Sequence, residues 1–192
     1  MDIWFTSDSH YGHKNIAGPT VSDWGSGYRG FDSVDAMNEA LVESYNVAKK
    51  NDIIYHNGDW SFGGHQNIVE FRNKIVCDNI HLVTGNHDKH IRKHAEHFTR
   101  VAQVIREKIG GKNFFLSHYA HKVWDGSGDG AYMLYGHSHG TLPDDPNLLS
   151  MDVGWDTCLF GHKKHTLYHI DEIISIMNTK TWQPVDHHGR AK

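Results

Sequence analysis

Directly after a short apolar run, the chain reads Gly85-Asn86-His87-Asp88. The run itself, Ile80-His81-Leu82-Val83, has the length and the β-branched content of a buried strand. We expect a tight turn at Gly85, because glycine tolerates backbone angles that other residues avoid. A lone Gly-Asn pair is also typical of a polar hairpin turn. Here the turn would place an amide, an imidazole and a carboxylate in one small volume, which favours a chemical role.

Four further strands are predicted over residues 3–7, 53–56, 114–117 and 131–135, and each is followed by polar residues. Those residues are Asp8 and His10 after the first, Asp59 after the second, His118 after the third, and His137 and His139 after the fourth. On an extended backbone, residues two apart point to the same side. Asp8 with His10, and His137 with His139, could therefore each reach a single ion.

Apolar residues at helical spacing predict helices between these strands. One helix should begin at Asp32 or Ser33, another near His65, and a last one should span residues 170–177. We also expect a polar helix over residues 89–94, a strand over 101–109, a hairpin turn at 110–113 and a flexible loop at the rim of the site over 125–130. Alternating strands and helices indicate an α/β fold, whose sites lie beyond the carboxyl ends of the strands.

The composition is polar and rich in histidine. The 192 residues include 18 histidines, with 38% hydrophobic and 22% charged residues and a net charge of −4. Histidine is the commonest side-chain ligand of metals and the commonest general acid or base. The acidic balance argues against stable binding of nucleic acid, although a nuclease could still hold phosphate through metal ions.

The length predicts one domain over residues 1–178, followed by a mobile tail over residues 179–192. No signal peptide and no apolar run of the ~18–20 residues that cross a membrane is visible, so we expect a cytoplasmic protein without membrane contact. The two cysteines, Cys77 and Cys158, lie far apart and argue against a disulfide framework or a thiolate metal site.

The candidate ligands are too many for one ion. They are Asp8, His10, Asp59, Asn86, His118, His137 and His139. All offer oxygen or imidazole nitrogen, which suits manganese, iron or zinc rather than a soft metal. Seven such donors are about right for two ions that share one bridging carboxylate.

In their order along the chain, these motifs resemble those of the calcineurin-like metallophosphoesterases. The order is Asp8-x-His10, Gly58-Asp59, Gly85-Asn86-His87-Asp88, His118 and Gly136-His137-x-His139. Each motif alone is a weak signal, but the complete set is specific and covers residues 8–140. The chain looks most like the small single-domain bacterial and phage members of this family.

The resemblance implies two packed β-sheets flanked by helices. It also implies one metal on Asp8, His10 and His139, and a second on Asn86, His118 and His137, with Asp59 bridging the two. The cofactors would then be two divalent transition metal ions. Manganese is the expected metal, with iron, zinc and nickel as alternatives.

The net charge of such a centre and the proton donor beside it fit hydrolysis of a phosphate ester. Two divalent ions with the carboxylates of Asp8 and Asp59 leave a net charge of about +2, or about +1 with a bridging hydroxide, which attracts an anionic phosphate. We expect that hydroxide to attack phosphorus. His87 lies beside a ligand but has no assigned metal, so it is the candidate general acid for the leaving group. Asp88 would orient His87 and favour its protonated form.

The expected function is hydrolysis of a phosphomonoester or phosphodiester in a small molecule or nucleotide. The alternatives are a metal-dependent nuclease and a non-catalytic metal-binding module of the same fold. A nuclease would need an aromatic and basic groove, and the sequence has only scattered residues of these types. Arg29, Tyr119 and His121 are candidate substrate contacts. The motifs leave the substrate, the native metals and the oligomeric state open.

Overall fold

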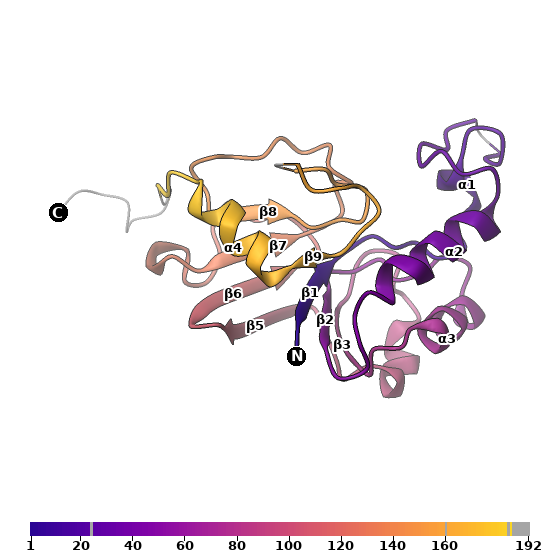
Figure 1. Cartoon of the computed structure of the whole chain (residues 1–192), viewed down its shortest axis with the longest axis horizontal. Helices are drawn as coiled ribbons and strands as arrows, with labels where there is room; N and C mark the ends of the chain where they lie inside the picture. The colour runs from indigo at the N-terminus through magenta and orange to yellow at the C-terminus, as the bar shows by residue number, and fades with distance from the viewer. Residues whose placement is uncertain (24, 160, 184, 186–192) are drawn as a thin grey trace.

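A computed structural model of the chain describes residues 1–23, 25–159, 161–183 and 185. The molecule consists of two β-sheets packed face to face, with helices on the outside (Figure 1). The strand order is β4-β3-β2-β1-β9 in the first sheet and β5-β6-β7-β8 in the second. The predicted α/β architecture of two packed sheets flanked by helices is confirmed.

The first sheet places three groups of predicted ligands along one edge. Its strands are β1 (Ile3–Thr6), β2 (Ile53–His56), β3 (Asn79–Val83), β4 (Arg100–Ala102) and β9 (Tyr168–His169). The first four run parallel, and Thr6 of β1 lies beside His56 of β2, which lies beside Leu82 of β3. Because parallel strands end at the same edge, the residues after β1, β2 and β3 leave the sheet side by side.

The second sheet delivers the remaining histidines at the same end. Its strands are β5 (Val104–Ile109), β6 (Lys112–Ser117), β7 (Tyr132–Tyr135) and β8 (Ser150–Asp152). The β5–β6 hairpin closes at Gly110-Gly111, whose φ angles of 56° and 82° suit glycine. From β6 onward the strands are parallel, and an isolated bridge between Ser7 and Gly154 joins the two sheets beyond β1 and β8.

The helices lie between and after the strands. They are α1 (Lys14–Ala17), α2 (Val34–Tyr45), α3 (His65–Lys74), the 3-10 helices η1 (Ile91–His97) and η2 (Ser127–Asp129), and α4 (Ile170–Asn178). Ser33 caps α2 as predicted, because its hydroxyl accepts the N–H of Ala36 at 3.0 Å. The polar helix predicted from residue 89 is a 3-10 helix with a kink at His94. None of the helices in the described ranges is long and apolar enough to cross a bilayer.

Two apolar cores hold the sheets in place. One lies between the sheets, where the Phe5 ring stacks on Tyr55 at 5.3 Å and on Phe114 at 5.5 Å. The other lies between the first sheet and α2 and α3, which cover its outer face (Figure 1), and includes Leu41 and Trp60. Burying both faces of the first sheet fixes the strand ends that carry the site.

The run 101–109, predicted as one strand, is two strands in different sheets. Val101 pairs with Leu82 in the first sheet, whereas Val104 pairs with Ser117 in the second. Gln103 lies between them. Both halves bury apolar side chains, so the pattern continues across the change of sheet and hides it.

The loop 125–130 is not at the rim of the site as predicted. It lies at the amino end of β7, opposite the predicted ligands, where Asp125 pairs with Arg106 at 3.0 Å.

The first residues of the predicted tail contact the body of the domain. The N–H groups of Thr181 and Gln183 donate to carbonyl oxygens of residues 146 and 147 at 2.8 Å. Lys180 also contacts the carboxylate of Asp144 at 2.6 Å. Residues 184 and 186–192 of the predicted tail lie outside the described residues, and the mobility of the tail stays a prediction.

Candidate metal centre

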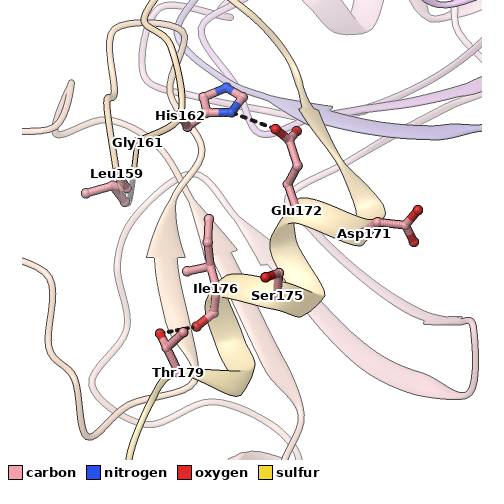
Figure 2. Close-up of a pocket in the computed structure, with 8 residues that line it drawn as sticks. All are labelled: Leu159, Gly161, His162, Asp171, Glu172, Ser175, Ile176 and Thr179. Carbon is pink, nitrogen blue, oxygen red and sulfur yellow. Dashed lines mark hydrogen bonds and ion pairs between the residues drawn. The ribbon is translucent and has the colours of Figure 1, made fainter.

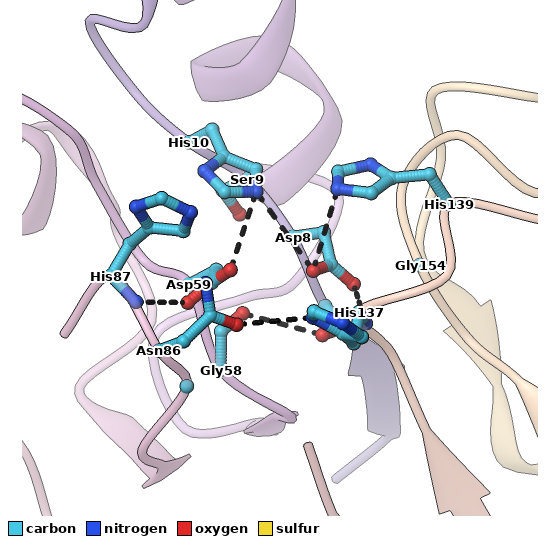
Figure 3. Close-up of polar contacts among 12 residues, drawn as sticks. Asp8, Ser9, His10, Gly58, Asp59, Asn86, His87, His137, His139 and Gly154 are labelled. Carbon is cyan, nitrogen blue, oxygen red and sulfur yellow. Dashed lines mark hydrogen bonds and ion pairs between the residues drawn. The ribbon is translucent and has the colours of Figure 1, made fainter. Parts of the chain in front are cut away.

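The seven predicted ligands come together beyond the strand ends, and all of them except His118 are labelled in Figure 3. Donor atoms of Asp8, His10 and His139 form one group, and those of Asp59, His118 and His137 form a second; within each group all atoms lie within 4.8 Å of one another. Asn86 joins the second group. Its Oδ1 lies 3.0 Å from His118 Nε2 and 3.0 Å from His137 Nδ1.

Asp59 lies between the two groups. Its Oδ2 is 3.5 Å from His10 Nε2 in the first group and 3.4 Å from His118 Nε2 in the second. Its Oδ1 accepts the backbone N–H of His87 at 2.8 Å, which fixes the orientation of the carboxylate. One oxygen of Asp59 therefore faces a histidine nitrogen of each group.

The carboxylate of Asp8 fits a cation. The residue is fully buried, and its Oδ2 accepts the N–H of His137 at 2.9 Å, whereas Oδ1 has no hydrogen-bond partner. Oδ1 lies 3.9 Å from His10 Nε2 and 3.8 Å from His139 Nε2. Burial raises the pKa of the Asp8 carboxyl to about 7. A cation among these three side chains would satisfy the orphaned oxygen and reverse that shift.

In the second group, the neighbouring charges and hydrogen bonds together outweigh burial. Burial raises the pKa of Asp59, but His118, His10 and the N–H of His87 lower it further. Burial lowers the pKa of His118, but Asp59, Asp8 and the carbonyl of Asn57 together raise it by more. The pKa of Asp59 falls below its usual range, and the pKa of His118 rises to about 9. A metal can bind His118 only after this proton leaves, so loading should weaken as the pH falls.

Five of the predicted ligands have an uncommon backbone conformation. Their φ values are 59° at Asp8, 49° at His10, 60° at Asp59, 66° at His137 and 48° at His139. Left-handed angles at residues other than glycine carry a cost of roughly 1–3 kcal/mol each, and they concentrate at functional sites. The strands thus end in strained turns that aim these side chains into one space.

Glycines beside the ligands make room for them. A Cβ at Gly85 would collide with Asp59 Oδ1, and a Cβ at Gly136 would collide with Ser7 Oγ and Asp8 Oδ2. Gly85 does not have a positive φ, so the expectation that it supplies unusual backbone angles is wrong. A glycine is needed at this position because the carboxylate of Asp59 lies against its Cα.

A model of the calcineurin-like phosphoesterase superfamily domain matches residues 1–154, most of the chain. This chain belongs to the calcineurin-like phosphoesterase superfamily. Members of this superfamily depend on metal ions, and the two groups of potential metal ligands agree with that. A search of curated proteins finds no relative of the sequence.

Three solved structures are similar to this phosphoesterase. A protein of unknown function from Aquifex aeolicus has 18% identity and a TM-score of 0.64, with 91% of this chain and 98% of that one covered. An archaeal phosphodiesterase has 21% identity and a TM-score of 0.49, covering 84% and 88%. YfcE, a phosphoesterase from E. coli, has 17% identity and a TM-score of 0.46, covering 80% and 78%. At this identity the first likeness shows the fold alone.

Arg29, predicted as a substrate contact, instead lies beneath the phosphoesterase site. Its side chain is fully buried, and Nε and Nη2 donate to the carboxylate of Asp156 at 2.9 and 2.8 Å. Nη1 and Nη2 also donate to the backbone carbonyls of Ser9 and Asp8, at 2.7 and 2.6 Å. The guanidinium therefore holds the strained turn that carries the first ligands, and the prediction of a substrate contact is wrong.

Replacing Arg29 tests this placement. Arg29→Ala leaves the buried Asp156 without its cation, so the free energy of unfolding should fall by about 3–5 kcal/mol. Arg106→Ala is the matched control, because its pair with Asp125 is exposed and should contribute less than about 1 kcal/mol. Denaturant unfolding of both variants measures the difference. An unchanged stability with a raised KM would restore the substrate-contact role.

Asp156 contacts the ring of His139, a predicted ligand, and was not among the site residues predicted from the sequence. Its Oδ2 lies 2.7 Å from His139 Nδ1, which leaves Nε2 of that histidine facing Asp8. A carboxylate behind a ligating histidine fixes the ring and its tautomer. The hydroxyl of Tyr28 lies 2.9 Å from the same Nδ1. The signal was present in the sequence, since Gly154-Trp155-Asp156 follows a strand much as Gly58-Asp59 does.

Asp88 does not orient the His87 ring as predicted. Among the described residues, its carboxylate is bonded to backbone alone: Oδ2 accepts the N–H groups of Asp59 and Gly85 at 2.8 Å, and Oδ1 accepts that of Trp60 at 3.0 Å. Burial raises the pKa of Asp88 to about 6 in spite of these donors. Asp88 thus ties the turn after β2 to the turn after β3, and the prediction is corrected accordingly.

Asp88→Asn should distinguish a role in holding the two turns together from a role in orienting His87. The amide offers one acceptor to three buried donors, so we expect the free energy of unfolding to fall by about 2–3 kcal/mol, together with weaker metal binding. Thermal unfolding and metal content of the purified variant measure this. A stable, fully loaded variant whose only defect lay in leaving-group dependence would contradict the backbone role.

The remaining predicted residues lie around the centre. The exposed His87 ring stands 5.2 Å from the His10 ring (Figure 3), and His87 belongs to neither ligand group. The Tyr119 hydroxyl lies 3.4 Å from Asn86 Oδ1, and the ring is 48% exposed. His121 is exposed and contacts Ser117 Oγ at 3.0 Å, just beyond the ligands.

A hollow with a volume of about 470 Å³ lies elsewhere and shares no residue with the centre. It is lined by α4 residues such as Glu172 and Ile176 and by His162 (Figure 2). No predicted ligand lines this hollow, so the gathered metal-binding donors and the hollow lie at different places on the molecule.

Proposed function

We propose that this chain is a binuclear metallophosphoesterase that hydrolyses phosphodiesters or phosphomonoesters, with His87 as the general acid. The position of Asp59 Oδ2, 3.4–3.5 Å from a histidine nitrogen of each ligand group, carries the proposal. A centre with a single metal ion would use only one of the two groups of potential ligands. The substrate would be a phosphate ester of a small molecule or a nucleotide.

The donor set suits two divalent transition metal ions. Asp8, His10 and His139 would hold one and Asn86, His118 and His137 the other, with Asp59 shared. When bound, the ions lower the pKa of a water molecule and neutralise charge on the phosphate oxygens. Oxygen and imidazole donors make manganese our first choice, with iron, zinc and nickel as alternatives.

His87 is placed to protonate the leaving group. Its backbone is fixed by the bond to Asp59 Oδ1, while its ring is exposed to an incoming substrate. The neighbouring His13 is a poorer acid at neutral pH, because burial lowers its pKa to about 4. His13 stacks instead on Phe62, with ring centroids 3.8 Å apart, and forms part of the wall beside His87.

Two exposed tyrosines flank the centre and could contact the substrate. Tyr119 reaches Asn86 in the second group, and Tyr28 reaches His139 in the first. Both residues are about half exposed, Tyr119 at 48% and Tyr28 at 53%. Aromatic rings in these positions can stack on a planar leaving group. Tyr119 and His121 remain candidate substrate contacts, and Tyr28 takes the place of the buried Arg29 among them.

Turnover of three substrates with added Mn²⁺ tests the proposal. The substrates are bis-p-nitrophenyl phosphate, p-nitrophenyl phosphate and single-stranded DNA. We expect hydrolysis of one or both nitrophenyl esters that stops when the metal is chelated. Preferential cleavage of DNA would favour the nuclease alternative, and no metal-dependent turnover on any substrate would favour a non-catalytic module.

A further inference from the structure

Four histidines that the phosphoesterase site does not use gather on a neighbouring surface. His65 begins α3, and His90, His94 and His97 lie just before or within η1. The His65 ring is 4.5 Å from the His90 ring and 5.0 Å from the His94 ring. Two elements that are distant in sequence thus bring several imidazoles to one place.

Three side chains in η1 form a compact set of donors. Donor atoms of His94, Glu96 and His97 all lie within 4.8 Å of one another, and they are the third such group in the described part of the chain. The Glu96 carboxylate is 3.7 Å from His97 Nε2. The other two groups form the phosphoesterase centre, so this one has no assigned role.

His65 is suited to position His94. Its Nδ1 lies 2.7 Å from His94 Nε2, which is a hydrogen-bond distance. Two nitrogen ligands on one tetrahedral zinc ion stand about 3.3 Å apart, given Zn–N distances of about 2.0–2.1 Å, so the two nitrogens are too close to share an ion. The contact therefore leaves Nδ1 of His94 for a ligand, with its other nitrogen held as in many metal sites.

The charges within the donor set also suit a cation. Glu96 adds one negative charge within the donor set. Imidazole and carboxylate together are typical ligands of zinc and its neighbours, whereas an anion would be repelled by Glu96.

We propose that His94, Glu96 and His97 bind one further divalent ion of the zinc class, with His65 as a positioning residue. The ion would tie the kink of η1 to α3 through His65. A pocket of about 170 Å³ lies next to this junction and is lined by Gly64, His87 and His90 among others. The bound ion would therefore brace one wall of the space beside His87.

Metal stoichiometry of the full-length, tag-free protein tests the proposal. Zn²⁺ equivalents are counted after dialysis by elemental analysis, and thermal unfolding is followed with and without Zn²⁺. We expect His97→Ala and Glu96→Gln each to lose one equivalent relative to the unmodified protein while hydrolysis of nitrophenyl esters persists. His65→Ala should weaken binding of that equivalent about 10–100-fold.

His90→Ala is the matched control, because it removes an exposed imidazole of the same surface from outside the donor set. It should keep the full number of equivalents and the full Zn²⁺-dependent rise in unfolding temperature. Equal stoichiometry in the unmodified protein, His97→Ala and Glu96→Gln would overturn the site. Loss of the equivalent in His90→Ala alone would also overturn the ligand assignment. Neither result depends on whether the phosphoesterase centre is active.

Discussion

Asp59→Asn should abolish most phosphoesterase turnover and release metal at the same time. The carboxylate oxygen that faces both His10 and His118 would lose its charge, or be replaced by an amide nitrogen that cannot bind a cation. Metal ions contribute several kcal/mol to such reactions, so we expect a loss on the order of a thousandfold or more. Steady-state kinetics and elemental analysis of the same preparation measure both effects.

Asp125→Asn is the control for this experiment. It makes the same chemical change at an exposed residue at the opposite end of the second sheet, where Asp125 pairs with Arg106. Its activity and metal content should equal those of the unmodified protein. An Asp59→Asn variant that retained two ions would refute the shared ligand, even if its activity were low.

His87→Ala should keep both ions and slow the esters with poor leaving groups most. A positioned general acid contributes about 10²–10⁴-fold when the leaving oxygen needs a proton, and far less when that oxygen is already stable as an anion. We therefore expect a large loss of kcat/KM for alkyl esters and a small loss for p-nitrophenyl esters. Rates for a series of leaving groups, plotted against the leaving-group pKa, give the result.

The slope of that plot decides the role of His87. A steeper dependence on leaving-group pKa in His87→Ala than in the unmodified enzyme identifies the acid. Equal slowing of every ester would count against it and would indicate that His87 only shapes the site. Metal analysis must accompany the kinetics, because the His87 N–H also holds Asp59 and a backbone shift could displace the ions.

The ligand positions could be predicted from the sequence because the fold is parallel. Asp8, Asp59 and Asn86 each follow an apolar run, and parallel pairing of β1, β2 and β3 places those ends at one edge. The same logic applies to His118 and His137 after β6 and β7. Local pattern and the fixed direction of the strands were therefore sufficient to bring these residues together.

The roles of Arg29 and Asp88 could not be predicted in this way. Both are polar residues near the ligands in sequence, which is equally compatible with facing the substrate or facing inward. Their direction depends on partners far along the chain: Asp156 for Arg29, and the backbone of Asp59 and Trp60 for Asp88. The change of sheet at Gln103 was hidden for a related reason, since apolar residues stand on both sides of Gln103 and each sheet buries apolar side chains.

The most direct test is anomalous diffraction from crystals of the protein grown with Mn²⁺. We expect two separate peaks beyond the strand ends, one contacted by Asp8, His10 and His139 and the other by Asn86, His118 and His137. Asp59 should contact both. A single peak among these residues, or a pair of peaks without Asp59 between them, would contradict the binuclear centre.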